Sequence, residues 1–443
     1  MEKDFVSIWG IYGLKTDPFC TTPILVKGGL VPAESFMGRE DEMKRLEKIF
    51  RSTGGSRVIV CGMQGVGKTT LINIARMRAL EKRFFTPYQE IKADADWGIN
   101  DFIINTISAI YSGLITIKNP HKNILEIINK IKPVFDLYEK EDKNYSLSIA
   151  VIGGGYGKTR TINKPEINTH FLTELFHNII ESLINSGFRE VIIHYNNLDN
   201  FDEEEAKLKA LFNRIRDFIQ TPQVHFIFVG SPTTSSIINS IPRVSNIITD
   251  TPISLESLSL PDIKKIIHTR IKLSAIEGMN YSDPVTNEAI ETLYELHNGN
   301  IRAILNSLST AIREITEEKP ILLTNATLKF VLYQIAKKRF ADKITKTMQV
   351  VLMEMLKQGE STNKSTTIKS GKKAQNISKY FNILKENQCI FLVRIDGREK
   401  YYSVAEWIKW LLLNPHKSQS ADPIQTLDTP PNPPAIRQNL KGH

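Results

Sequence analysis

The sequence contains few cysteines and no long hydrophobic run. Its three cysteines, Cys20, Cys61 and Cys389, lie far apart, without the spacings of a zinc site or a disulfide framework. No apolar run approaches the ~20 residues that span a bilayer, and the run over 407–413 is interrupted by Lys409. The first ten residues include acids and lack the apolar centre of a secretion signal. We therefore expect a cytoplasmic protein with three ordinary thiols and no membrane partner.

The chain also has no strong excess of one charge and no unusual composition. Its 443 residues, 41% hydrophobic and 24% charged, are typical of a folded protein and long enough for about three domains. Lys and Arg exceed Asp and Glu by nine. This modest basic excess makes nucleic acid a candidate partner without proving it.

A glycine-rich stretch is the strongest signal in the sequence. The β-branched residues over 56–61 predict a buried parallel strand, and the apolar spacing after residue 70 predicts a helix. Between them stands G-x-x-x-x-G-K-T, the phosphate-binding P-loop motif. Its glycines let backbone N–H groups converge on phosphate oxygens at a helix N-terminus. Lys68 is expected to reach the outer phosphates and Thr69 to bind Mg²⁺. The motif predicts a bound nucleoside triphosphate and Mg²⁺ as cofactors, held by Gly62, Gly65, Val66, Gly67, Lys68, Thr69 and Thr70.

Strands and helices alternate from residue 37 to 258. The runs over 191–195 and 224–229 predict buried strands, the stretch over 251–255 a last short one, and 87–91 a second strand. The helix between these central strands is expected over 203–219, and residues 241–244 are expected to close another. This alternation predicts an α/β domain with a mostly parallel, helix-covered sheet. Residues 1–36, rich in Pro and Gly, predict an extended arm lying on that domain.

An insertion over about 100–165 interrupts the α/β domain. It is mostly helical in pattern, with a predicted hairpin over 145–162. Gly157, Lys158 and Thr159 imitate a second P-loop, but the first glycine is missing and a poor helix start follows, so we reject that reading. A basic hairpin tip that touches phosphates through Lys158, Arg160 and Lys164 and a plain solvated loop remain equally open.

The C-terminal third predicts two further domains. Residues 259–340 have helical spacing throughout and predict a small helical lid. Residues 341–413 predict a winged helix-turn-helix, with a first helix over 348–356, a turn at Gly371 and two strands at 389–393 and 400–404. This region has 13 Lys and Arg against seven Asp and Glu, as duplex DNA binding requires. A winged helix used for protein contacts is the alternative. Residues 414–443, with six of the 20 prolines, predict a disordered tail. The candidate DNA-binding residues are Lys372, Lys373, Gln375, Asn376, Lys379 and Arg398.

In this domain order, the chain over about 36–410 resembles the initiator-type AAA+ ATPases, the origin-recognition and helicase-loader group. Residues 36–40, F-M-G-R-E, resemble that group's adenine-adjacent stretch, which implies nucleotide contacts for Phe36, Gly38 and Arg39. The resemblance implies that Ser231 is the sensor-1 residue near the γ-phosphate and that Arg243 is an arginine finger toward a neighbouring subunit. It also implies that Arg302, in a G-x-x-R segment, is the sensor-2 arginine. The same resemblance implies that the nucleotide is ATP, and a homo-oligomer in the ATP state and a loaded or recruited protein partner follow from it.

The Walker B strand departs from this family. Where the family has Asp for Mg²⁺ and Glu to polarise water, this chain has Asn196 and Asn197. An amide is not a base and binds Mg²⁺ weakly, so Asp199, or more remotely Asp202, is the candidate substitute. Our hypothesis is an ATP-binding switch whose hydrolysis is slow or stimulated by a partner. Catalytic roles are assigned on this basis to Lys68, Asn197, Asp199, Ser231, Arg243 and Arg302, and metal binding to Thr69 and Asn196.

Three functions fit these features. The first is an ATP-controlled switch that binds duplex DNA through the winged helix and loads or recruits another factor. The second is a STAND-type signalling or defence NTPase, which oligomerises on nucleotide exchange and packs its winged helix on the ATPase domain. The third is a transposition-regulator ATPase that forms filaments on DNA. Binding of the duplex by the winged helix, with a steep salt dependence, distinguishes the first from the second.

Overall fold

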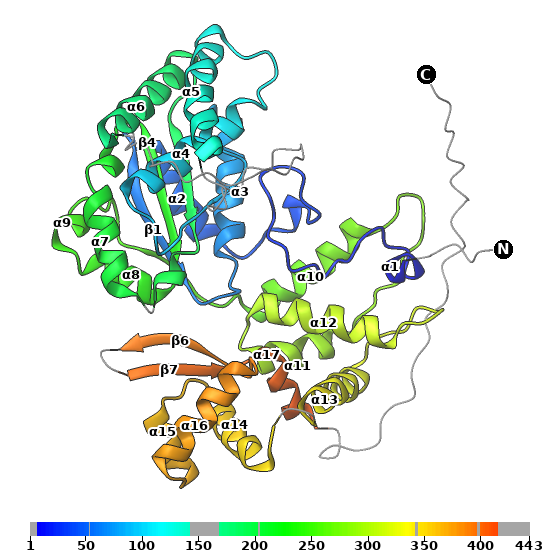
Figure 1. Ribbon diagram of the computed structural model, residues 1–443. Helices are drawn as coiled ribbons and strands as arrows, with labels where there is room; N and C mark the ends of the chain where they lie inside the picture. Colours follow the sequence, from blue (N-terminus) through cyan, green and yellow to red (C-terminus); the bar gives the residue numbers. More distant parts are fainter. Residues whose placement is uncertain are drawn as a thin grey trace. The chain divides into compact units, whose positions relative to one another are not determined.

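The chain folds into two compact units. The computed structural model describes residues 7–52, 54–141, 168–202, 204–341, 344–396 and 399–414. One unit, here called the P-loop unit, comprises residues 23–29 and 39–256; the other, the lid unit, contains residues 7–22, 30–38 and the described chain from 257 onward. The predicted basic hairpin, Arg398 and the predicted tail beyond Asn414 lie outside the described residues. Figure 1 shows the elements in both units.

A five-stranded parallel sheet forms the centre of the P-loop unit, as the sequence predicts. Its order is β2-β3-β4-β1-β5, and every neighbouring pair is parallel. All residues of β3 and β4 are buried, because helices cover both faces of a parallel sheet. The strands are β1 (Ser56–Gly62), β2 (Ile91–Lys92), β3 (Val191–Asn196), β4 (Val224–Gly230) and β5 (Ile253–Leu255).

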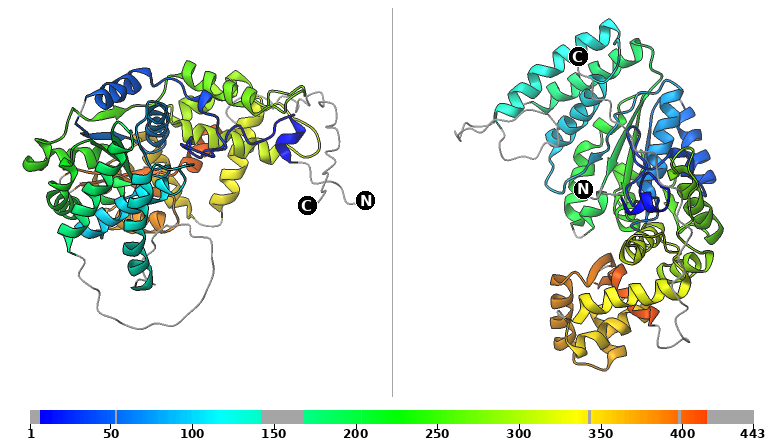
Figure 2. Two further views of the ribbon diagram at one scale, coloured as in Figure 1. Left: turned by 90° about the horizontal axis from the view of Figure 1, so that it is seen from above. Right: turned by 90° about the vertical axis from the view of Figure 1, so that its right-hand side faces the viewer.

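Helices lie on both sides of this sheet. In the right-hand view of Figure 2, the blue α2 and α3 lie on one side and the cyan and green α4, α5 and α6 on the other. The helices of the P-loop unit are α2 (Glu40–Arg51), α3 (Lys68–Glu81), α4 (Ile99–Leu114), α5 (Lys122–Glu141), α6 (Thr169–Asn185), α7 (Glu205–Ile215), α8 (Pro232–Asn239) and α9 (Pro242–Ser245), with 3₁₀ turns η2 (Leu198–Phe201) and η3 (Phe218–Gln220).

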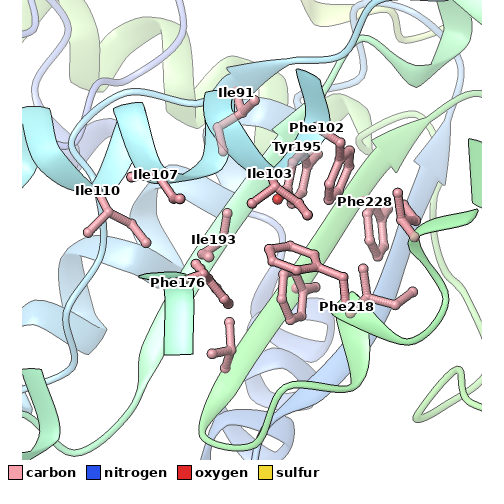
Figure 3. Packing of buried hydrophobic residues seen from close by; sticks show 14 of the residues in the cluster. Ile91, Phe102, Ile103, Ile107, Ile110, Phe176, Ile193, Tyr195, Phe218 and Phe228 are labelled. Atoms are coloured by element: carbon pink, nitrogen blue, oxygen red, sulfur yellow. The ribbon is translucent and has the colours of Figure 1, made fainter. Parts of the chain in front are cut away.

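Aromatic side chains fill the core between the sheet and α4. Tyr195 on β3 stacks on Phe102 of α4, with ring centroids 4.5 Å apart, and on Phe228 of β4 at 5.3 Å (Figure 3). The Tyr195 hydroxyl is buried and shares a 2.5 Å hydrogen bond with Thr106, so its polar atom has a partner inside the core. Since Tyr195 immediately precedes Asn196, this packing fixes the end of β3 at which the candidate site lies.

Two predicted boundaries differ from the structure for identifiable reasons. The second strand was expected over 87–91, yet β2 begins only at Ile91. Pro87 has no N–H, and the side chain of Arg76 donates to the carbonyls of Pro87 and Gln89, so these groups do not pair with a strand. Residues 241–244 were expected to end a longer helix. Instead α8 ends at Asn239, and Pro242 opens the separate helix α9, since proline fits a first helical turn.

The lid unit contains the predicted bundle of helices. They are α10 (Leu260–Ser274), α11 (Asn287–His297), α12 (Ile301–Ile315) and α13 (Asn325–Ala341). The described part of the N-terminal arm forms α1 (Ile8–Ile11) and the 3₁₀ turn η1 (Ala33–Ser35). The arm was predicted to lie on the α/β domain. Residues 23–29 do belong to the P-loop unit, where the Ile24 carbonyl accepts from Asn73, but Trp9, Tyr12, Leu14 and Phe19 are buried in the lid core. Burial of these four large apolar side chains explains the difference.

The C-terminal part of the lid unit has the element order predicted for a winged helix-turn-helix. Three helices, α14 (Lys346–Gln358), α15 (Asn363–Ser370) and α16 (Ala374–Glu386), precede an antiparallel pair, β6 (Ile390–Asp396) and β7 (Glu399–Val404). Gly371 ends α15 with φ 65°, which is the predicted turn. The chain continues into α17 (Glu406–Lys409) and η4 (Trp410–Leu413), and Trp410 is buried among the lid helices.

Candidate nucleotide site

The P-loop joins β1 to α3 through glycines in the left-handed region. Gly65 and Gly67 have φ 88° and 99°, and Gly67 is the residue before the first turn of α3. Gly62 ends β1 with φ 155°, and a Cβ there would lie 2.5 Å from the carbonyl oxygen of Leu255 on β5. A side chain would therefore push β5 away from β1. The motif folds as the sequence predicts: strand, turn with positive φ, helix N-terminus.

Lys68 curls over this loop. Its ammonium group donates to the carbonyl of Gly62 at 2.7 Å and to that of Met63 at 3.1 Å. Thr69 and Thr70 follow in the first turn of α3, and all three residues are half-buried. One cation, a hydroxyl and a helix N-terminus thus meet at a single loop, which is a donor set suited to a phosphate chain and its bound Mg²⁺.

Asn196 connects the end of β3 to this loop. Its side-chain nitrogen donates to the Thr69 hydroxyl and to the Glu90 carboxylate, at 3.1 Å in each case. Its side-chain oxygen accepts the Asn197 backbone N–H at 2.9 Å. A carboxylate accepts and a backbone N–H donates, so these partners fix the orientation of the amide. The amide nitrogen, not the oxygen, faces Thr69.

Asn197 adopts a left-handed backbone conformation. Its φ is 62° and its ψ 26°, and it precedes η2, which contains Asp199. Asparagine tolerates this conformation better than most residues with a Cβ. The position therefore favours Asn for a reason of backbone geometry.

Ser231 and Asp202 meet at the neighbouring strand end. The Ser231 hydroxyl, directly after β4, donates to Asp202 at 2.7 Å, and the Thr234 hydroxyl donates to the same oxygen at 2.8 Å. Burial raises the pKa of Asp202 and the nearby Asp199 charge raises it further; the two hydroxyls and Lys68 act in the opposite direction. The remote candidate of the sequence analysis is thus the carboxyl group that contacts the predicted sensor residue.

Arg39 supports the loop from the start of α2. It is 6% exposed and donates through Nη2 to the carbonyl of Val66, at 3.0 Å, and to the carbonyl of Glu256. Its Nη1 pairs with Glu42 at 3.1 Å. In the structure Arg39 therefore holds the backbone of the P-loop, a role that the resemblance did not supply; its predicted contact with the nucleotide stays a prediction.

The resemblance also named Phe36, Gly38, Arg243 and Arg302. Arg243 is exposed on α9 of the P-loop unit. Phe36 and Gly38 belong to the lid unit, as does Arg302, which is exposed in the first turn of α12. Their assigned roles remain predictions.

The predicted DNA-binding residues gather at the start of α16. Ile377, Phe381 and Leu384 are buried on one face of this helix. Lys373, Gln375, Asn376 and Lys379 are exposed, and Lys372 is partly so. A helix N-terminus with exposed Lys, Gln and Asn is the combination that reads base edges in the major groove.

Sequence reasoning missed Glu90 and Arg76. Arg76, on α3, is fully buried and hydrogen-bonds Thr86 and Asn73, each at 2.9 Å. Burial lowers its pKa to about 10, and the charge of Glu90 opposes that shift. An acidic residue inside the segment predicted to be the second strand was the one available signal for Glu90. In the parts of the chain that the structure describes, no three His, Cys, Asp or Glu side chains gather as a metal site.

Comparison with known proteins gives distant similarities. No protein-family model matches the chain. An uncharacterized HTH-type transcriptional regulator of Methanocaldococcus jannaschii is 23% identical over 324 residues, which cover 68% of this chain and 69% of that protein. Similar solved structures include the Aeropyrum pernix ORC1 protein in complex with DNA (14% identity, TM-score 0.41, covering 88% of this chain and 96% of that one). The Aeropyrum pernix ORC2 protein (11%, TM-score 0.44, 90% and 96%) and Drosophila ORC bound to DNA (11%, TM-score 0.38, 87% and 89%) are also similar.

Within the described ranges, no helix has the length and hydrophobicity needed to cross a membrane.

Proposed function

We propose that this protein is an ATP-binding switch that controls binding of duplex DNA by its C-terminal part. The observation that carries the proposal is the P-loop itself. Glycines with positive φ, Lys68 over the loop and Thr69 in the first turn of α3 form a phosphate site with its charge already in place.

In this proposal the chain binds the triphosphate through groups already positioned. The N–H groups that open α3 bind phosphate oxygens, and Lys68 moves its ammonium from the loop carbonyls to the outer phosphates. Arg39 donates to the Val66 carbonyl and so holds the loop in place before the nucleotide binds. The Thr69 hydroxyl would supply one oxygen to Mg²⁺ bound with the nucleotide, and that ion would supply neutralisation of phosphate charge.

We expect slow hydrolysis of ATP because of the residues that follow β3 and β4. Asn197 carries no carboxylate, and its predicted substitute Asp199 lies two residues on, in η2 rather than at the strand end. The remaining acid, Asp202, accepts hydrogen bonds from two hydroxyls through one carboxylate oxygen. Loss of a general base removes factors of ~10²–10⁴ from a rate. We therefore propose that the bound nucleotide persists until a partner, such as a neighbouring subunit offering Arg243, completes the site.

DNA binding is assigned to α16 and the strands after it. The exposed Lys373, Gln375, Asn376 and Lys379 support this assignment, as does the name of the HTH-type relative. Base contacts from Gln375 or Asn376 would give specificity, and lysine contacts to phosphates would give affinity that falls with salt.

We assign the coupling between nucleotide binding and DNA binding to the lid unit. The imidazole of His297 on α11 contacts Glu406 at 2.6 Å, and Trp410 donates to Ser307 of α12 at 3.0 Å. These contacts fasten the C-terminal part to the lid, so a lid that responds to nucleotide through Arg302 would move the DNA-binding face with it.

The test measures ATP binding, ATP turnover and duplex binding by the full-length protein. We expect the wild type to bind ATP with Mg²⁺, to hydrolyse it slowly, and to change its affinity for duplex DNA when ATP is bound. Lys68→Ala should abolish ATP binding and with it the change in duplex affinity. Lys379→Ala should weaken duplex binding and reduce the slope of log affinity against log salt by about 1. Lys357→Ala, an exposed lysine at the end of α14, is the matched control.

Three outcomes would contradict parts of this proposal. Unchanged ATP retention in Lys68→Ala would refute the nucleotide site. Nucleotide-dependent assembly without duplex binding would favour the STAND-type alternative. Filaments that form only along DNA would favour the transposition-regulator alternative.

A further inference from the structure

The Glu90 carboxylate lies beside the position where a Walker B strand ordinarily carries its aspartate. One nitrogen, Nδ2 of Asn196, is within 3.1 Å of both the Glu90 carboxylate and the Thr69 hydroxyl. The Thr69 hydroxyl, which is predicted to bind Mg²⁺, and the Glu90 carboxylate are therefore both neighbours of the Asn196 amide. Asn196 brings no negative charge to the end of β3, but Glu90, the residue directly before β2, brings one next to it.

The orientation of Asn196 prevents this amide from binding a cation as it stands. Its oxygen is engaged by the Asn197 N–H, and its nitrogen points at Thr69. An amide nitrogen bears N–H donors and no lone pair for a metal. An oxygen donor beside Thr69 must then come from another residue, and Glu90 is the acid that the hydrogen bonds place there.

Arg76 holds the segment that carries Glu90. It donates to Thr86, to the carbonyl of Pro87 and to that of Gln89, at 3.2 Å for the last. Because Arg76 is fully buried on α3, the helix that also carries Thr69, both oxygen donors are fixed to one element. Glu90 itself is half-exposed, so its carboxylate is accessible from solvent.

We propose that Glu90 replaces the missing Walker B aspartate as the carboxylate that holds Mg²⁺ beside Thr69. The inference rests on the proposed nucleotide site. One carboxylate and one hydroxyl suffice, because Mg²⁺ in nucleotide sites takes its other oxygens from phosphates and water.

The experiment compares ATP affinity with Mg²⁺ and with EDTA, using the full-length protein. For the wild type we expect Mg²⁺ to strengthen ATP binding at least about tenfold. Glu90→Gln keeps an acceptor for the Asn196 amide but removes the charge, so Mg²⁺ should change its ATP affinity by less than about twofold. Binding in EDTA should be equal to that of the wild type or stronger. Glu81→Gln, at the exposed end of α3, is the matched control and should behave as wild type.

A charge exchange makes the test specific. The double variant Glu90→Gln with Asn196→Asp puts the carboxylate on β3 and should restore most of the Mg²⁺ effect. Thermal unfolding of each variant shows that it is folded. A wild-type Mg²⁺ effect in Glu90→Gln, an equal loss in Glu81→Gln, or no recovery in the double variant would overturn the inference. Lys68→Ala separates this from failure of the proposed function, since ATP binding that survives in Lys68→Ala refutes the nucleotide site itself.

Discussion

Replacing Arg39 by methionine should loosen the P-loop even when no nucleotide is present. The variant keeps side-chain length but removes the donors to the carbonyls of Val66 and Glu256 and the ion pair with Glu42. A buried carbonyl left without a partner costs about 1–3 kcal/mol. Glu42 is 23% exposed and regains water, so we assign no loss to it. The Val66 carbonyl is buried and should lose about 2 kcal/mol, and the partly buried Glu256 carbonyl about 1 kcal/mol, so we expect local destabilisation of about 3 kcal/mol.

Hydrogen exchange of peptides over 62–72 in the nucleotide-free protein measures this effect. A local opening that is easier by about 3 kcal/mol speeds exchange about 10²-fold. ATP affinity should fall together with it, because the binding loop must then be ordered on binding. Arg51→Met, an exposed arginine at the end of α2, should leave exchange of these peptides unchanged. Unchanged P-loop exchange in Arg39→Met with reduced ATP affinity would refute the bracing role and favour a direct nucleotide contact.

Three further predictions concern stability. Trp410→Ala should cost about 3–5 kcal/mol and expose η4 to hydrogen exchange, since Trp410 is 1% exposed in the lid core; wild-type protection would contradict this packing. Burial lowers the pKa of His297, although the hydrogen bond and charge of Glu406 act in the opposite direction. Burial alone would raise the pKa of Glu406, but His297 and Lys409 favour its charged form, so its pKa is lowered. Stability from both groups is therefore present at neutral pH and lost as pH falls, first below the ordinary His value of 6.5 and then below 4.5. The melting temperature should drop from pH 7 to 5, and less so in His297→Gln. Asn197→Ala should cost about 1 kcal/mol and Asn197→Gly less than half of that, because φ is 62°; equal losses in thermal unfolding would show that backbone strain is not the cause.

Local patterns predicted most of the fold. The P-loop strand and helix, the two central strands and the lid helices each depend on a run of apolar residues with one period, so neighbouring residues suffice to recognise them. The buried face of α16 follows in the same way from Ile377, Phe381 and Leu384. The start of β2 was misplaced because it is determined by Arg76, which lies on another element and takes the carbonyls of the preceding segment.

The candidate site was predictable where a motif or the family resemblance names its residues, which includes Asn196 beside Thr69 although the two lie 127 positions apart. Lys68 and Thr69 follow from the P-loop spacing. The contact of Glu90 with Asn196 joins residues 106 positions apart, and that of Ser231 with Asp202 joins residues 29 apart. Such contacts depend on strand order, which no local pattern encodes. The bracing role of Arg39 was hidden for the same reason, since its acceptor carbonyls can belong to any residue type.

The two asparagines at the end of β3 are joined by a hydrogen bond, so we expect substitutions at these positions to be coupled. Asn196 must accept from the Asn197 N–H and donate to Thr69 and Glu90, which an amide does and a carboxylate does not. Asn197 must adopt positive φ, which glutamate adopts less readily. Restoring Asp and Glu together should therefore lower stability, because a carboxylate at position 196 would oppose Glu90 and a glutamate at position 197 would be strained. Thermal unfolding of Asn196→Asp with Asn197→Glu tests this, and adding Glu90→Gln should recover the electrostatic part; a double variant as stable as wild type would show that the asparagines are not coupled to Glu90.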